Sequence, residues 1–392
     1  MKGISMKKKL TITVLLFIYF FSPSSVLAVS ESIPDELQNR WLDSGEIEDQ
    51  WRHELSDYRE YLPFAADEHW LDPIKDGSVF SLKNWLDGIS RFFIDEWMQN
   101  GRLIALLIFL TLLSVFLKVL VNSFENQSVS QISYFVIFGV LLTLAITSFH
   151  QAVTYTTEAI HGMGHFMLAL LPLMLSMMAA FGNVASVAFF HPLILFFVQM
   201  SGVLITKVVL PLFFFSAILS IASEINKDYN VTQFAKLMKH IAFGILGAFL
   251  TLFLSVMSLQ GVNAAVTDGV AIRATKFVTS NFIPVIGKMF TDATDTVLSA
   301  SLLLKNTIGL AGVVMVMIIT LFPALKVLVL GLIFKVTAAI LQPVADGPIV
   351  EVIDIMGKHI FYILTALLTI SLMFFFSLVM LIIVGNMTLM IR

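Results

Sequence analysis

The chain contains no cysteine in its 392 residues, and charged residues make up only 13% of it. The missing thiols exclude disulfides, thiolate metal sites and cysteine nucleophiles, but they do not distinguish an oxidising compartment from a reducing one. Catalytic motifs are missing too, since there is no phosphate-binding Walker sequence, no His-Glu-x-x-His helix and no Gly-x-Ser-x-Gly turn. We therefore expect no enzymatic activity, no catalytic residues and no cofactor.

Apolar sequence is what the chain has in excess, with 58% hydrophobic residues and 35 phenylalanines. A soluble globular domain rarely has this composition. After Arg102, several stretches are as long as a bilayer is thick and carry few or no charges. We expect an all-α fold, a polytopic integral membrane helical bundle over residues 101–392.

The N-terminus has the pattern of an export signal. Lys7, Lys8 and Lys9 precede an apolar run, and small residues follow up to Ala28. This pattern predicts a signal peptide over residues 1–28 with cleavage after Ala28. The alternative is an uncleaved first anchor, and in both cases the chain from residue 30 starts outside the cytoplasm.

Residues 29–100 form an acidic extracytoplasmic segment that holds 17 of the 27 acidic residues and only six Lys and Arg. This charge disfavours nucleic acid as a partner. Ser81 can cap an amphipathic helix over residues 81–99. Two interpretations stay open, a helix in the lipid headgroup layer and a core-facing helix of a small extracytoplasmic domain. The apolar residues expected on one face are Leu82, Trp85, Leu86, Ile89, Phe92, Phe93 and Trp97.

The sequence predicts seven to nine membrane spans, because some candidate pairs could instead be re-entrant hairpins. Alternate crossings place residues 223–240 inside, where Lys227, Lys236 and Lys239 fit the positive-inside rule, and residues 342–358 outside. The candidates are Leu103–Val121, Ile132–Phe149, Phe166–Phe181, Val184–Ile205, Val208–Ala222, Ile241–Gln260, Thr307–Phe322, Leu325–Leu341 and Ile360–Val384.

Four prolines lie within or beside these apolar runs, at Pro172, Pro192, Pro211 and Pro323. Each lacks a backbone donor, so we expect kinked or broken helices around an interior surface. His191, beside Pro192, is expected to be a hydrogen-bonded interior residue, and a proton relay is the alternative. Glu158, His161 and His165 have helical spacing, but the intervening glycines weaken a helix there, so we predict no metal site.

The segment 261–306 is too apolar for a free loop and too polar for a lipid-facing helix. Asn281 to Pro284 should divide it into two amphipathic pieces, either at the interface, re-entrant, or folded into the bundle. Charges near membrane depth are costly unless paired or hydrated, so Asp268 with Arg273, and Asp292 or Asp295 with Lys288, are candidate ion pairs. A solvated loop with a surface helix is the alternative. The candidate conduit or interface residues are Asp268, Arg273, Lys276, Pro284, Lys288, Asp292, Asp295, His191 and Pro192.

The run from Asp268 to Asp295, DGVAIRATKFVTSNFIPVIGKMFTDATD, resembles the stage III sporulation protein AE family. Four shorter runs are similar to the same family: Ala188 to Pro192, Val209 to Leu212, Ser216 to Ser220 and Ser299 to Asn306. The resemblance covers essentially the whole chain, and the acidic segment is its least distinctive part.

This resemblance implies a role in endospore formation, as a multi-pass protein of the mother-cell membrane that surrounds the forespore. It implies membership of the assembly that connects the two cells and is needed for late forespore gene expression. The implied partners are a cytoplasmic ATPase, ring-forming membrane proteins, stage II sporulation protein Q and further copies of the chain. We expect an export-gate or permease-like subunit. The alternatives are a non-conducting scaffold for ring proteins and an autonomous secondary transporter.

Overall fold

The computed structural model describes residues 45–64, 69–123, 127–180, 182–225, 231–282, 286–344 and 348–390. All regular structure in these ranges is helical, which confirms the predicted all-α membrane bundle. The predicted signal peptide and residues 29–44 lie outside the described residues. The helices are α3 (Gly45–Leu55), α4 (Asp72–Lys75), α5 (Leu82–Gln99), α6 (Gly101–Ser123), α7 (Gln127–Ala180), α8 (Val184–Leu204), α9 (Leu210–Ile225), α10 (Thr232–Phe282), α11 (Ile286–Leu341) and α12 (Pro348–Met390), with 3-10 turns η1 (Ser56–Tyr61) and η2 (Ser78–Phe80) and a π-helical turn η3 (Ile205–Val209).

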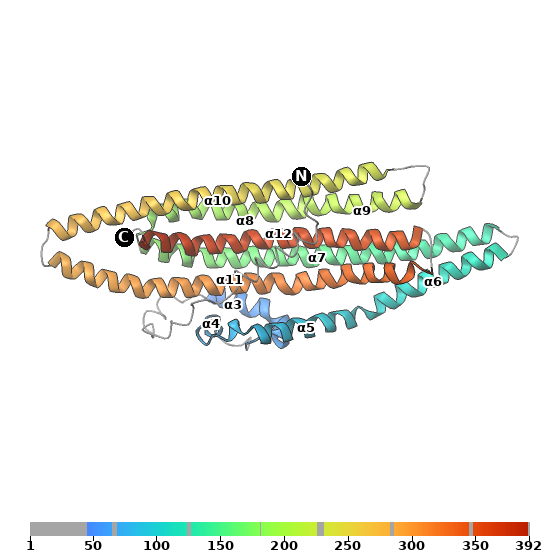
Figure 1. Ribbon diagram of the computed structural model, residues 1–392, viewed down its shortest axis with the longest axis horizontal. Helices are drawn as coiled ribbons and strands as arrows, with labels where there is room; N and C mark the ends of the chain where they lie inside the picture. Colours follow the sequence, from blue (N-terminus) through green and yellow to red (C-terminus); the bar gives the residue numbers. More distant parts are fainter. Residues whose placement is uncertain are drawn as a thin grey trace, which may run out of the picture.

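Long antiparallel helices run side by side along the molecule (Figure 1). Helices α8, α9 and α10 form one edge, α3, α4 and α5 the opposite edge, and α7, α11 and α12 lie between them. Helix α11 is the central one, since 72% of its apolar window is buried, against 28% to 50% in the other long helices. Its glycines allow this packing: a Cβ on Gly309 would lie 2.5 Å from Ile382 Cγ1 of α12, and one on Gly312 would collide with Leu170 of α7.

Among the described residues, fewer helices are able to span a membrane than the seven to nine candidate spans of the sequence. Five helices among the described residues are long and apolar enough to cross a membrane, or six if α5 and α6 form one span with a 44° bend. Neighbouring candidates belong to single continuous helices, as the candidates 307–322 and 325–341 both belong to α11. The span-capable segments are Val136–Ala180, Val184–Glu224, Thr232–Leu259, Lys305–Leu341 and Pro348–Val384.

The helices are not broken at the prolines, which contradicts the expected breaks. Pro172, Pro192 and Pro323 lie inside α7, α8 and α11, which continue through them. Before Pro211 the helix widens into the π-helical turn Ile205–Val209. A proline clashes with the carbonyl four residues earlier, and a π-turn relieves this clash without ending the helix.

The predicted topology is wrong for the segment before α12. The start of α10 and the start of α12 lie at the same end of the bundle (Figure 1). Lys239 Nζ of α10 lies 5.7 Å from the centre of the Tyr362 ring of α12. Two spans were predicted between residues 307 and 341, but these residues belong to one helix, α11. Helices α10 and α11 therefore each run along the bundle once, in opposite directions, and the chain returns to the end at which α10 begins. Residues 231–240 therefore share one side of the bundle with residues 342–344 and 348–358.

The acidic segment packs against α7 and α11 through aromatic side chains. The Tyr58 ring stacks on Phe322 of α11 with centroids 4.2 Å apart, and Phe92 of α5 meets the same ring edge-on at 4.9 Å. Lys326 Nζ lies over the rings of Tyr58 and Tyr155, at 5.5 Å and 5.1 Å. These contacts place the segment along the bundle, as a packed part of the fold.

Helix α5 occupies the position of the predicted amphipathic helix, but its buried face differs from the predicted one. Trp85, Gly88, Phe92 and Glu96 are buried, whereas Leu82 and Leu86 are exposed. Ser81 precedes the helix without a side-chain capping hydrogen bond. A helix in the headgroup plane would lie at roughly a right angle to a following span, but α5 bends by only 44° into α6. The core-facing interpretation is the one that fits.

Candidate conduit and interface residues

Asp268 is buried near the end of the bundle and caps helix α8. Its Oδ1 accepts a hydrogen bond from the backbone N–H of Ala185 at 2.8 Å, and its Oδ2 accepts from the N–H and the hydroxyl of Ser186 at 2.9 Å and 2.6 Å. The first amides of a helix have no partners within it, and the helix dipole favours a negative charge there. Asp268 therefore joins α10 to α8. It does not pair with Arg273, whose side chain is exposed, so the predicted ion pair is wrong.

The other sequence candidates are not gathered into one site by the described residues. His191 and Pro192 are exposed on α8, which contradicts the expected interior position of His191. The side chains of Lys276, Lys288, Asp292 and Asp295, and all of Pro284, lie outside what the structure describes.

The helices observed over residues 261–306 differ from the two separate amphipathic pieces predicted there. Helix α10 ends at Phe282 and α11 begins at Ile286, which agrees with the predicted interruption. The two pieces are extensions of α10 and α11, and their hairpin reaches beyond the ends of α7, α8 and α12 (Figure 1). Arg273, Lys276, Lys288, Asp292 and Asp295 all belong to this hairpin.

Lys305 is fully buried between α11 and α12. Its Nζ donates to Asn386 Oδ1 at 2.9 Å and to the Ile382 carbonyl at 3.3 Å. Both acceptors are neutral, so this ammonium is stabilised by dipoles and not by an ion pair in the described part of the chain. A buried cation in a membrane bundle is costly and is found where function or specific packing needs it.

A second polar group joins α11 and α12 near the other end of the bundle. Asp354 forms ion pairs with both Lys335 and Lys358, one through each carboxylate oxygen. The Lys335 and Asp354 side chains are 30% and 24% exposed. The degree of burial of this group is therefore intermediate between that of a buried and that of a surface ion pair. One carboxylate thus neutralises two ammonium groups.

His359 connects three helices at the same level. Its Nε2 lies 3.1 Å from Ser216 Oγ of α9, and its Nδ1 lies 2.8 Å from the Ile355 carbonyl. The Ser216 hydroxyl donates to the Ala235 carbonyl of α10 at 2.9 Å. The chain of contacts from α12 through α9 to α10 satisfies polar groups that would otherwise be buried without partners.

The residues considered for a metal site, Glu158, His161 and His165, are exposed on α7. The His161 and His165 rings are 6.5 Å apart. Across the described ranges, no group of three or more His, Cys, Asp or Glu side chains could hold a metal ion.

The contact of α3 with α7 involves a carboxylate and a glycine. Glu54 lies against the backbone of α7, where a Cβ on Gly162 would be 2.7 Å from Glu54 Oε1. Burial raises the pKa of Glu54 above its ordinary value, and the nearby His53 and His165 partly offset this increase. The docking of α3 therefore places a poorly solvated carboxyl group against α7.

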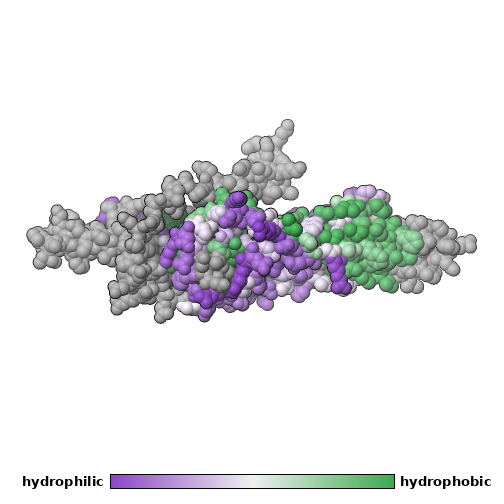
Figure 2. Space-filling view, turned by 90° about the horizontal axis from the view of Figure 1, so that it is seen from below, coloured by the Kyte–Doolittle hydropathy of each residue, from purple (hydrophilic) through white to green (hydrophobic). Residues whose placement is uncertain are grey.

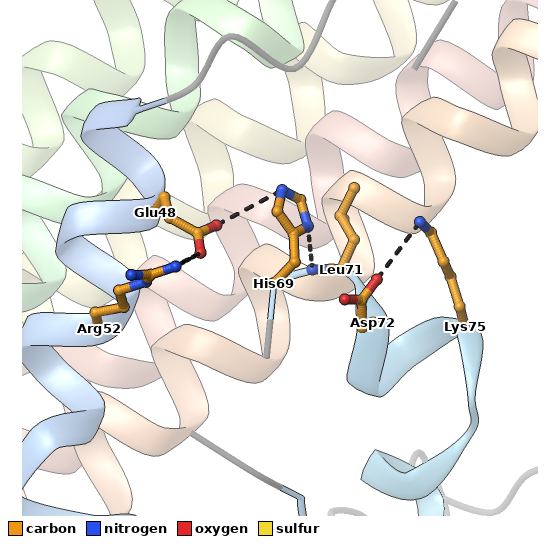
Figure 3. Close-up of polar contacts among 6 residues, drawn as sticks. All are labelled: Glu48, Arg52, His69, Leu71, Asp72 and Lys75. Atoms are coloured by element: carbon orange, nitrogen blue, oxygen red, sulfur yellow. Dashed lines mark hydrogen bonds and ion pairs between the residues drawn. The ribbon is translucent and has the colours of Figure 1, made fainter. Parts of the chain in front are cut away.

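Polar contacts also hold the acidic segment together. Glu48 Oε1 accepts from Arg52 at 3.0 Å, and Glu48 Oε2 lies 3.6 Å from His69 Nε2 (Figure 3). The Leu71 N–H points to His69 Nδ1 at 3.4 Å, so His69 joins α3 to the start of α4. Viewed from the side of α3 to α5, this segment forms a hydrophilic surface beside a hydrophobic one (Figure 2).

The buried polar groups were largely missed by reasoning from the sequence. Lys305 is not among the predicted site residues, and its only signal in the sequence is a lone lysine after three leucines. Asp354 and Lys358 have the i, i+4 spacing of a helical ion pair. Nothing in the sequence predicts that Lys335 pairs with Asp354. The contact between Ser216 and His359 is equally unpredicted.

Comparison with known proteins gives two matches. The family model described as stage III sporulation protein AE matches residues 67–385. A protein of Bacillus subtilis (strain 168) named stage III sporulation protein AE is 47% identical over 351 residues, which cover 90% of this chain and 88% of that protein. No solved structure matches.

Proposed function

This chain belongs to the stage III sporulation protein AE family, and we propose that it is the polytopic membrane subunit of a channel complex that joins mother cell and forespore. In this proposal the chain lies in the mother-cell membrane around the forespore and acts as an export gate or permease-like conduit. It performs no chemistry of its own. A cytoplasmic ATPase, ring-forming proteins and stage II sporulation protein Q are the proposed partners.

The observation that carries this proposal is the α10–α11 hairpin. It extends beyond the other long helices and carries Arg273, Lys276, Asp292 and Asp295 (Figure 1). Charged residues on helices that continue from membrane spans are favoured where water or a partner protein surrounds them. Such a hairpin is suited to the mouth or the seal of a conduit.

The buried polar groups support the same function. Lys305 with Asn386, and Lys335 with Asp354 and Lys358, lie between α11 and α12 at different levels of the bundle. A helix pair that serves only as an anchor in lipid gains little from buried charges. Polar side chains that can change hydrogen-bond partners are useful where helices move against each other during transport.

A scaffold is the second candidate, and the acidic segment favours it. This segment is docked on the bundle and presents exposed carboxylates, including Asp49, Asp57 and Glu60, which could bind ring proteins without any conduction.

The test neutralises the hairpin while complex assembly is monitored. Arg273→Gln, Lys276→Gln, Asp292→Asn and Asp295→Asn are each compared with Lys236→Gln, an exposed lysine at the opposite end of α10. A conduit predicts loss of late forespore gene expression with normal co-purification of the partners. Unchanged expression in all four variants, or loss of assembly before loss of expression, contradicts the conduit function of the hairpin.

A further inference from the structure

Helix α8 begins with a residue that is able to cap it. Asn183 occupies the N-cap position, because its carbonyl accepts the first hydrogen bond of the helix, from the Val187 N–H at 3.0 Å. Asparagine is among the residues preferred at this position, since its side-chain oxygen can accept from the N–H two or three residues later. In α8 these donors belong to Ala185 and Ser186.

Asp268 of α10 occupies the same two donors. Its two carboxylate oxygens accept from the Ala185 N–H at 2.8 Å and from the Ser186 N–H at 2.9 Å. The Asn183 side chain makes no capping hydrogen bond. A local residue and a residue of another helix therefore compete for one pair of amides.

The Asn183 side chain is left without a partner in this arrangement. It is 1% exposed, and within the described ranges neither its Oδ1 nor its Nδ2 has a hydrogen-bond partner. Buried amide groups are nearly always hydrogen-bonded, because they lose their hydration on burial. The contact of Asp268 with α8 thus satisfies the start of α8 but leaves Asn183 unsatisfied.

A local change of the backbone is enough to make Asn183 the cap. Its φ of −84° is typical of extended backbone, and only its ψ of 49° differs from the extended conformation of most N-cap residues. The preceding Gly182 has a φ of 80°, and glycine adopts other conformations easily because it has no Cβ. Rotation at these two residues can turn the Asn183 side chain toward Ala185 and Ser186.

Asp268 can reach water when it leaves α8. The carboxylate is buried, but Val266, Thr267 and Val270 around it on α10 are exposed. Arg273, five residues further along, is exposed as well, so this end of α10 accommodates charged groups at its surface. A small displacement of α10 is therefore sufficient to hydrate the carboxylate.

The position of Asp268 makes its contact an anchor for the α10–α11 hairpin. Helix α8 begins at Val184, whereas α10 continues past Asp268 to Phe282. At a rise of 1.5 Å per residue, this last part of α10 is about 21 Å long. It reaches beyond the start of α8 (Figure 1). Asp268 thus holds the hairpin to the bundle near the point at which the hairpin leaves it.

We propose that Asn183 is a reserve cap of α8 that replaces Asp268 when α10 moves away, so that the hairpin can detach from the bundle and attach again. In the attached state Asp268 caps α8 and Asn183 has no partner. In the detached state Asn183 accepts from one amide of α8 and Asp268 is hydrated. Each arrangement satisfies what the other leaves open, which gives the two alternative states that a switching element needs.

The exchange of caps is independent of conduction. Only its use to open or close a conduit rests on the function proposed above.

The effect of Asn183→Ala on the melting temperature in detergent tests the exchange. In the otherwise unsubstituted chain it should leave the melting temperature unchanged or raise it, because it removes an unsatisfied buried amide. In the Asp268→Ala background it should lower the melting temperature, because it removes the remaining cap. Asn183→Ser is the control, since serine also caps helices and should preserve the melting temperature of Asp268→Ala.

The sign of the effect is decisive. A decrease of the same size in both backgrounds would assign Asn183 a fixed structural role and overturn the proposal. No effect of Asn183→Ala in the Asp268→Ala background would overturn it as well, because α8 would then have no reserve cap.

Movement of the hairpin is measured without any change at Asp268. The chain has no natural cysteine, so spin labels at Phe189→Cys and Val270→Cys, both exposed, report the distance between α8 and α10. Two distances are expected, and Asn183→Ala should deplete the longer one because it removes the cap of the detached state. A single distance that Asn183→Ala does not change would overturn the proposal.

Late forespore gene expression separates this inference from the proposed function. If Asn183→Ala depletes the longer distance and also reduces expression, a conduit uses the exchange of caps. Depletion of the longer distance with normal expression would support the exchange and contradict its use by a conduit.

Discussion

Asp268 and Ser186, which are 82 residues apart in the sequence, join α10 to α8. The carboxylate of Asp268 accepts from both the hydroxyl and the amide of Ser186, at 2.6 Å and 2.9 Å, and closes the N-terminus of α8. An acidic residue predicted to line a conduit thus has a structural role that explains its burial.

Replacing this carboxylate should destabilise the bundle. Asp268→Ala leaves the amides of Ala185 and Ser186 without an acceptor, and we expect a loss of about 1–3 kcal/mol of unfolding free energy. Thermal unfolding of the purified protein in detergent measures the change. Arg273→Ala, an exposed position on the same helix, is the control and should stay close to the unsubstituted protein. Equal melting temperatures for both variants would argue against the cap.

The contact between Lys305 and Asn386 should show strong coupling. Asn386→Leu leaves a buried ammonium without its closest acceptor and should cost about 1–3 kcal/mol. Lys305→Met removes the charge at similar volume, so it should be nearly neutral or stabilising. The double variant should recover most of the loss caused by Asn386→Leu. Additive effects in this double-mutant cycle would contradict a direct contact.

Asp354 is expected to be the essential member of its ion-pair group. Asp354→Asn leaves both Lys335 and Lys358 without a counter-charge, and partial exposure limits the cost to about 1–3 kcal/mol. Lys358→Gln removes only the more exposed lysine and should cost less. Detergent-solubilised melting curves compare the two, and a larger effect of Lys358→Gln would refute this ranking.

The docking of α3 should depend on pH through Glu54. Burial raises its pKa in the docked state, so the docked state binds the proton more tightly than the undocked one. The stabilisation is fully present below the ordinary carboxyl pKa and is lost as pH rises through the raised value. The protection factors of the α3 amides, which are measured exchange rates relative to the intrinsic rates at the same pH, should therefore be higher at acidic pH.

Two variants check this assignment. Glu54→Gln should flatten the dependence of α3 exchange on pH, because it removes the titrating group. Gly162→Ala should speed exchange at every pH, because the new Cβ would meet Glu54 Oε1 at 2.7 Å. A pH dependence that persists in Glu54→Gln would assign it to another group.

The sequence predicts the helical membrane class well but not the number of helices. The apolar runs and the interruption near Pro284 are local signals, and the helices α10 and α11 end and begin beside it. Pro172, Pro192 and Pro323 are also local signals, yet the helices continue because packing along their length outweighs one lost hydrogen bond. Continuity depends on neighbouring helices, which the sequence does not reveal.

The same limit applies to the site. Lys335 is 19 residues from Asp354, and Ser216 is 143 residues from His359, so these contacts arise only from the antiparallel packing of α9, α11 and α12. Asp268 is a predicted conduit or interface residue that the structure shows to be buried, and it does not pair with Arg273 as predicted. Its true partners are the amides at the start of α8, whose position follows from tertiary structure.

The account depends most on the arrangement of the bundle across the membrane, in which the N-terminal ends of α10 and α12 share one side. Single cysteines at Lys236, Val344 and Val184, all exposed, can be labelled with a membrane-impermeant maleimide from either side. We predict that Lys236→Cys and Val344→Cys react from the same side and Val184→Cys from the other. Labelling of Lys236→Cys and Val344→Cys from opposite sides would contradict it.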